Sequence, residues 1–79
     1  MKLKTAEQIN EFKALVGKCV GNVYLVSPDR NDFFNMRSNF SKFIAIDRLL
    51  NDPDTSWEVH CSDPFDQLKV QEFINSLEK

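Results

Sequence analysis

The sequence predicts a small α+β domain in which three helices cover one face of a four-stranded, mainly antiparallel sheet. Its 79 residues are enough for one domain, spanning residues 1–79. Stretches with the apolar spacing of helices alternate with short stretches that have the spacing of strands. Seven Phe, one Trp and one Tyr supply the dense core that so short a chain needs. The expected order is strand, helix, strand, strand, helix, strand, helix, which forms an open-faced sandwich.

The chain is expected to begin with a strand and a helix. Met1–Lys4 alternates apolar and charged residues, as a half-buried strand does. Thr5 and Gln8 then fit a capping box, in which the hydroxyl caps the helix amides and the glutamine reaches back. Apolar residues follow at helical spacing, so the first helix is predicted over Ala6–Lys18.

A β-hairpin is predicted next. Strands at Asn22–Val26 and Phe33–Met36 flank the turn-forming segment Ser27–Asp32, which contains Pro and Asp in favoured places. Alternation along these strands predicts one face toward the helices and one open face. The residues expected on the open face, together with those of the other strands, are Lys2, Lys4, Tyr24, Val26, Phe33, Glu58 and His60.

The second half of the chain repeats the alternation of helix and strand. Ser38 is the predicted N-cap of a helix that ends at Asn51–Asp54, where Pro53 stops it. A strand is predicted at Ser56–Cys61, and Asp63–Pro64 begins the last helix. The apolar residues of the two helices are Phe40, Phe43, Ile44, Ile46, Leu49 and Leu50 in the first, and Val70, Phe73, Ile74 and Leu77 in the second.

Composition and charge argue against several classes of partner. The net charge is −2 and the chain has no cluster of cations, which argues against nucleic acid and against an anionic membrane surface. No stretch has the roughly 20 apolar residues of a membrane span, and no export signal is apparent. We therefore expect a cytoplasmic protein, in which Cys19 and Cys61 are free thiols.

The residue types that carry chemistry are sparse. His60 is the only histidine, it lies in a strand, and with two Cys it falls short of a zinc site. The Asp residues occupy turns and helix ends, as caps and turn formers do. We therefore expect no catalytic residue, no metal and no cofactor, and predict that the protein is not an enzyme.

The order of elements resembles HPr, the histidine-phosphorylatable carrier of the bacterial sugar phosphotransferase system. The resemblance extends from Ala6 onward, and its most specific part is Phe33–Ser38, followed by an apolar helix. HPr proteins carry a similar strand reading Asn-Leu-Lys-Ser before their second helix. The resemblance implies the HPr fold, with four strands and three helices.

The chain departs from HPr where HPr carries its phosphate. HPr has a loop before its first helix with a reactive His followed by Arg-Pro, and the helix N-terminus helps to hold the phosphate. Here Lys4 leads almost directly into Thr5, and no His, Arg or Pro precedes Phe12. Glu7 would repel a phosphoryl group. The chain therefore resembles an HPr-like domain without the phosphocarrier loop.

Two candidate sites remain, each with an alternative. Ser38 matches the serine that a dedicated kinase phosphorylates in some HPr proteins, but an N-cap is the favoured explanation, because the neighbouring residues differ from those of HPr. Tyr24, Val26, Phe33 and His60 form a candidate interface on the open sheet face, and the alternatives are scattered surface residues or a one-residue error in register.

We expect a non-catalytic, HPr-like module for protein interaction or regulation. Its partner would be a phosphotransferase-system protein, an unrelated protein, or a second copy bound through the open sheet face. The alternative function is that of a phosphotransferase-system component phosphorylated at Ser38 or His60.

Overall fold

A computed structural model of the chain describes residues 1–77. Its elements, in chain order, are α1 (Ala6–Lys18), β1 (Val23–Val26), β2 (Phe33–Asn35), α2 (Asn39–Asn51), β3 (Glu58–Cys61) and α3 (Pro64–Leu77). The strands form an antiparallel sheet in the order β2-β1-β3. The predicted α+β class is therefore confirmed, with three helices and three strands among the described residues.

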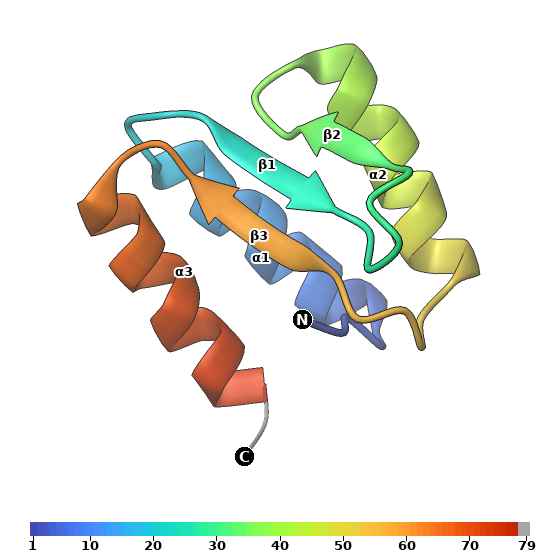
Figure 1. The fold of residues 1–79 in the computed structure, drawn as a ribbon. Helices are drawn as coiled ribbons and strands as arrows, with labels where there is room; N and C mark the ends of the chain where they lie inside the picture. The colour runs from blue at the N-terminus through green and yellow to red at the C-terminus, as the bar shows by residue number, and fades with distance from the viewer. Residues whose placement is uncertain (78–79) are drawn as a thin grey trace.

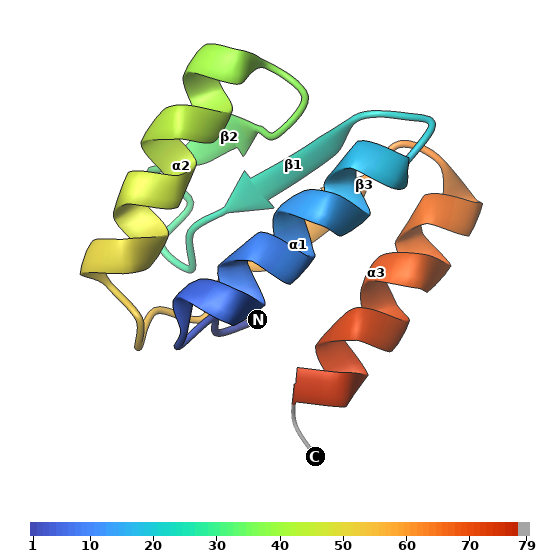
Figure 2. The same ribbon diagram turned by 180° about the vertical axis from the view of Figure 1, so that it is seen from behind.

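The helices form one layer on one face of the sheet, and the other face carries no described helix (Figure 1). Figure 2 shows this layer from the front, with α1 in the middle between α2 and α3. Contacts join α2 to β2, α3 to β3, and α1 to both other helices. The two outer helices therefore lie over the two edges of the sheet.

The register of the sheet agrees with the alternation predicted from the sequence. Leu25 in the central strand lies opposite Phe34 on one side and Val59 on the other, and these residues face the helices. Tyr24 lies opposite His60 and points to the other face, because neighbouring residues of a strand alternate. The strands are one or two residues shorter than predicted.

The fourth strand, predicted at Met1–Lys4, is wrong: this segment is not a strand. Its first residue exchanges two backbone hydrogen bonds with Trp57, each 2.7 Å, immediately before β3. The segment then leaves the sheet edge, because Leu3 is buried in the core. Its last residue donates its amide to Gln8 Oε1 at 2.8 Å, so that this amide serves the start of α1 rather than a strand.

Side chains form hydrogen bonds with backbone groups at both ends of α1. Thr5 Oγ1 accepts the amide of Gln8 at 3.1 Å, as the capping box predicts. At the other end, Arg37 Nη1 donates to the carbonyls of Val16 at 3.1 Å and of Cys19 at 2.6 Å. A guanidinium at a helix C-terminus is also favoured by the helix dipole. Arg37 thereby ties the segment between β2 and α2 to the end of α1.

The turn between β1 and β2 is held by its own polar side chains. Ser27 Oγ donates to Asp29 Oδ1 at 2.6 Å and accepts the amide of Asp32 at 3.0 Å. Arg48, from α2, forms an ion pair with Asp32 at 2.6 Å. Arg30 adopts a left-handed conformation with φ of 62°, which costs a non-glycine residue about 1 kcal/mol. These contacts fix the hairpin and anchor it to α2.

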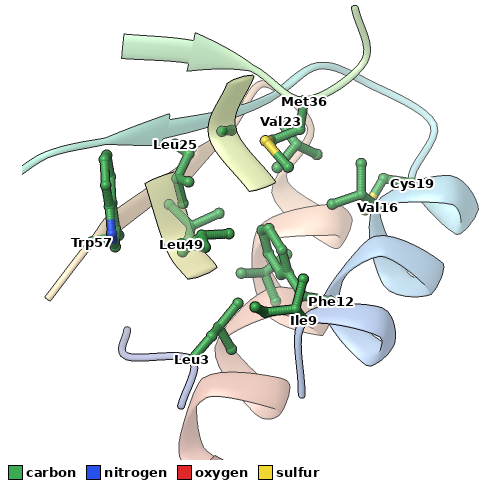
Figure 3. Close-up of a cluster of buried hydrophobic side chains, with 13 residues drawn as sticks. Leu3, Ile9, Phe12, Val16, Cys19, Val23, Leu25, Met36, Leu49 and Trp57 are labelled. Atoms are coloured by element: carbon green, nitrogen blue, oxygen red, sulfur yellow. The ribbon is translucent and has the colours of Figure 1, made fainter. Parts of the chain in front are cut away.

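The core lies between the helical layer and the sheet (Figure 3). Phe12 of α1 is fully buried at its centre and stacks on Phe73 of α3, with ring centroids 6.1 Å apart. The other buried members are Leu3, Ile9, Val16, Cys19, Val23, Leu25, Met36, Ala45, Leu49, Trp57, Val59 and Val70.

A buried carboxylate joins the start of α3 to the loop after α1. Asp66 is fully buried, and its carboxylate accepts the amide of Gly21 at 2.8 Å and that of Val20 at 3.1 and 3.2 Å. The hydrogen bond from Gly21 lowers the pKa of Asp66 below its usual value, and it outweighs the opposing effect of burial. Asp63 caps the same helix by accepting the amides of Phe65 and Asp66.

We predict that Asp66→Asn destabilises the fold. We also predict that the stability of the variant depends less on pH than that of the wild type. Because the folded pKa of Asp66 is depressed, the carboxylate stabilises the fold above its unfolded pKa, about 4. That stability is lost as the pH falls through the folded pKa. The Tm of the variant should be lower by about 5–15 °C at pH 7, and this difference should shrink below pH 4.

The matched control is Asp54→Asn, because Asp54 is exposed in the loop after α2. Thermal unfolding followed by circular dichroism from pH 2.5 to 7 measures both variants. A pH-independent difference between wild type and Asp66→Asn would contradict the role given to the carboxylate.

Candidate functional site

The predicted open face of the sheet contains a stacked aromatic pair. Tyr24 of β1 and Phe33 of β2 lie on this face as diagonal neighbours, with ring centroids 4.9 Å apart and ring planes inclined by 25°. Phe33 remains 62% exposed. Val26 lies between Phe33 and Glu58 on the neighbouring strands and is only 6% exposed. The apolar surface available to a partner on this face is therefore mainly the Tyr24–Phe33 pair.

His60 lies on the same face and is exposed. It is directly opposite Tyr24, and Glu58 precedes it by two residues on the same side of β3. Glu58 forms an ion pair at 3.3 Å with Arg30, which lies in the turn between β1 and β2. Within residues 1–77, no group of three or more His, Cys, Asp or Glu is placed to hold a metal ion. The structure thus brings together the four residues predicted as an interface and gives His60 no acidic partner in the described part of the chain.

Ser38 occupies the N-cap position of α2, as predicted, but does not make the capping bond. Its backbone is extended, with φ of −86° and ψ of 125°, and its hydroxyl accepts no hydrogen bond from the helix. Its carbonyl accepts the amide of Lys42 at 2.8 Å. The adjacent cation, Arg37, is already bonded to the end of α1. A phosphate on Ser38 would therefore depend on the amides at the start of α2.

The largest group of exposed apolar side chains lies on α2, and the sequence did not reveal it. Phe40 is 76% exposed, Phe43 77%, Leu50 57% and Ile44 37%. Their spacing places them on one side of the helix, away from Ala45 and Leu49, which are buried. We call Phe40, Phe43, Ile44 and Leu50 the α2 stripe. Exposed apolar groups of this size are typical of interaction surfaces.

One acidic residue lies within the α2 stripe. Asp47 follows Phe43 by four residues and Ile44 by three, and it precedes Leu50 by three, so it shares their side of the helix. It is exposed, and its carboxylate has no hydrogen-bond or ion-pair partner in the described chain. The α2 stripe therefore surrounds an unpaired negative charge.

A second, smaller apolar group surrounds the start of α3. Val20 is exposed in the loop after α1, and Phe65 and Leu68 are exposed on the first turns of α3. The Asp66 hydrogen bonds hold Val20 beside this helix. This group is built on the same contact that stabilises the fold, and it is separate from the α2 stripe, which lies on the opposite outer helix (Figure 2).

Shallow hollows accompany these surfaces. One, of about 450 Å³, is lined by Lys2, Lys4, Gln8 and residues of α3. Another, of about 270 Å³, lies beside the hairpin turn, where Arg48 and Asp32 neutralise each other. Neither hollow brings together a pair of groups suited to general acid–base catalysis. The titratable side chains of the first are lysines. In the second, Asp32 is paired with Arg48, and hydrogen bonds from Ser27 and Asn31 lower the pKa of Asp29.

The two cysteines form no disulfide, and their surroundings lower the reactivity of both thiols. Cys19 is buried and Cys61 is partly buried. Burial raises the pKa of the Cys61 thiol to about 11, and the neighbouring Cys19 raises it further in the same direction. Burial, followed by the charge of Asp66, also raises the pKa of Cys19. Both groups are therefore protonated thiols at neutral pH.

Comparisons with protein-family models, with curated proteins and with solved structures found no match for this chain. Within the described residues, no helix combines the length and the apolar character needed to cross a bilayer. The candidate sites are therefore judged by their geometry.

We predict slow alkylation of both thiols in the folded protein. A rise of the Cys61 pKa from 9.0 to about 11 leaves roughly one hundredth of the thiolate of an ordinary cysteine. Iodoacetamide at pH 8 should therefore label Cys61 about 100-fold more slowly than it labels the chain unfolded in urea, and Cys19 should also be slow. Mass spectrometry with time measures both. Labelling of either cysteine at the unfolded rate would contradict the raised pKa values.

Proposed function

We propose that this chain is a non-catalytic, HPr-like domain that binds another protein through the α2 stripe. The observation that carries the proposal is the exposure of Phe40, Phe43, Ile44 and Leu50 on one side of α2. Leaving such side chains in water forgoes roughly 1.5–3 kcal/mol each relative to burial. A partner that covers them recovers part of that free energy.

The HPr-like part of the proposal is supported by topology. The three helices cover one face of an antiparallel sheet in which consecutive strands form a hairpin. The hydrogen bonds between Met1 and Trp57 lie at the free edge of β3, where a fourth strand would be added. The start of α1 has Thr5 and Gln8 in place of a phosphate-carrying loop, which supports a role without phosphate transfer.

The open sheet face is a second binding surface in this proposal. The Tyr24–Phe33 pair presents stacked rings, and Phe33 is largely exposed. The surface is smaller than the α2 stripe because Val26 is buried between its neighbours. The proposal includes two specific partners: a second copy bound through this face, and phosphotransferase-system proteins. The crosslinking experiment described next distinguishes them.

Photo-crosslinking tests the proposal. Variants carry benzoylphenylalanine at Phe43, in the α2 stripe, at Phe33, on the open face, or at Glu11, which is exposed on α1. In cells that make the protein, irradiation should join another protein to the probe at position 43 and not to the probe at position 11. Peptide mass spectrometry identifies the adduct and shows whether it is a second copy.

A matched stability control accompanies the crosslinking. Phe43→Ser should change the Tm little, because Phe43 is exposed. Phe12→Ala should cost about 3–5 kcal/mol, because Phe12 fills the core. Equal adducts from positions 43 and 11, or none from position 43, would contradict binding through α2.

A phosphoryl-transfer function is the second candidate, and it is favoured by one observation. The Ser38 hydroxyl lies at the start of α2 without a capping bond, where a phosphate would meet the positive end of the helix dipole. His60 is exposed, and its neighbours on the open face, Tyr24 and Glu58, include no cation to hold a phosphate.

We predict no phosphorylation at either residue. Incubation with phosphoenolpyruvate and the first enzyme of the phosphotransferase system should leave no acid-labile phosphate, and the HPr serine kinase with ATP should leave no acid-stable phosphate. Intact-mass measurement, with a genuine HPr as positive control, detects both. A phosphate lost in His60→Ala or in Ser38→Ala would establish the second candidate instead.

A further inference from the structure

Building on the proposed binding through α2, we infer the chemistry of the partner: an amphipathic helix whose apolar side carries a Lys or Arg that pairs with Asp47. The inference comes from the length of the α2 stripe, from the unpaired charge within it, and from the positions of the cations on α2.

The α2 stripe has the dimensions of a helix–helix contact. Phe40 and Leu50 are ten residues apart, which corresponds to about 15 Å along a helix. Side chains at successive spacings of three and four residues form the ridges into which another helix packs. Helical segments that dock in this way present apolar anchors at the same spacings. A partner helix of about three turns would therefore cover the stripe.

Asp47 determines the charge of that partner. A helix that covers Phe43, Ile44 and Leu50 also removes Asp47 from water, because these residues surround it. A buried carboxylate without a partner is costly, whereas a cation facing it restores a charge-assisted hydrogen bond.

A second copy of this chain fits the stripe less well. In a two-fold antiparallel pairing about residue 45, Phe40 would face Leu50, but the two Asp47 carboxylates would be only one turn, about 6 Å, apart along the axis. The cations of α2 cannot neutralise them. Arg48 is bonded to Asp32, and Lys42 lies on the side of α2 toward Val16 and Met36. Self-pairing would therefore bury like charges.

The test uses synthetic helical peptides as probes. Two fluorescein-labelled peptides of 16 residues carry leucines at positions that match the stripe. They differ only at the centre of the leucine face, where one has Lys and the other Glu. Fluorescence anisotropy at 0.15 M salt measures their binding to the full chain. The Lys peptide should bind about tenfold more tightly, as expected for a charge pair enclosed by apolar groups.

Charge reversal on the protein identifies the residue responsible. Asp47→Lys should invert the preference, so that the Glu peptide binds more tightly, and Asp47→Asn should abolish it. Asp54→Lys makes the same change of charge outside the stripe and should keep the original preference, because salt screens exposed charges. Circular dichroism confirms that each variant is folded.

Several outcomes would overturn the inference. These are no binding of either peptide, equal binding of both, a preference that Asp47→Lys leaves unchanged, or an NMR footprint outside α2. Sedimentation that shows a dimer disrupted by Phe43→Ser would assign the stripe to a second copy. Stripe-dependent binding to phosphatidylglycerol vesicles, without peptide binding, would assign it to a lipid surface. In the peptide failures, an adduct at position 43 would still support protein binding through α2.

Discussion

The arrangement of the helical layer depends on one carboxylate that is removed from water. Asp66 lies in the first turn of α3 and accepts the amides of Val20 and Gly21, which follow α1 in the chain. These amides follow the C-cap of α1, Cys19, so they lie outside the helix and need partners from elsewhere in the chain. The Asp66 side chain therefore provides hydrogen-bond acceptors for two amides of the loop after α1. It also positions α3 beside this loop and fixes the direction in which the chain enters β1. A Cβ at Gly21 would meet Ser62 Oγ at 2.5 Å, so a larger residue there would displace the hydroxyl that accepts the amide of Asn22.

The sheet is too narrow for the helices that cover it, and this mismatch creates the α2 stripe. Three strands at about 4.8 Å spacing place the outer strands roughly 10 Å apart, whereas three helices at 8–10 Å spacing need about twice that width. With α1 central, α2 and α3 must overhang the two edges (Figure 2). The overhanging side of α2 keeps Phe40 and Phe43 exposed, although Ala45 and Leu49 are buried on the same helix. The same geometry leaves Phe65 and Leu68 exposed on α3.

Local signals in the sequence predicted the elements, because each depends on residues close together in the chain. The capping pair Thr5 and Gln8 placed the first helix with the bounds observed, and Asp63–Pro64 placed the start of the last one. Contacts between distant residues could not be predicted in this way. Asp66 has the sequence position of an ordinary acidic residue in a first helical turn, and its bond to Gly21 appears only when α3 packs beside α1. The missing strand at Met1–Lys4 has a similar cause, since burial of Leu3 competes with pairing at the edge of β3.

The same distinction between local signals and distant contacts applies to the candidate sites. Alternation along short strands correctly placed Tyr24 and Phe33 on one face, because register determines facing and requires no knowledge of the helices. The exposure of the α2 stripe was not predictable, because apolar residues at helical spacing look the same whether a sheet covers them or not.

Asp47 makes the α2 stripe selective for its partner. An uncharged stripe of this size would favour indiscriminate association, since apolar contact is not directional. A carboxylate within it raises the free energy of every pairing that offers no cation, including pairing with a second copy. It lowers the free energy of a pairing that does offer one, relative to those alternatives. The charge that reduces self-association is thus the charge that selects the partner.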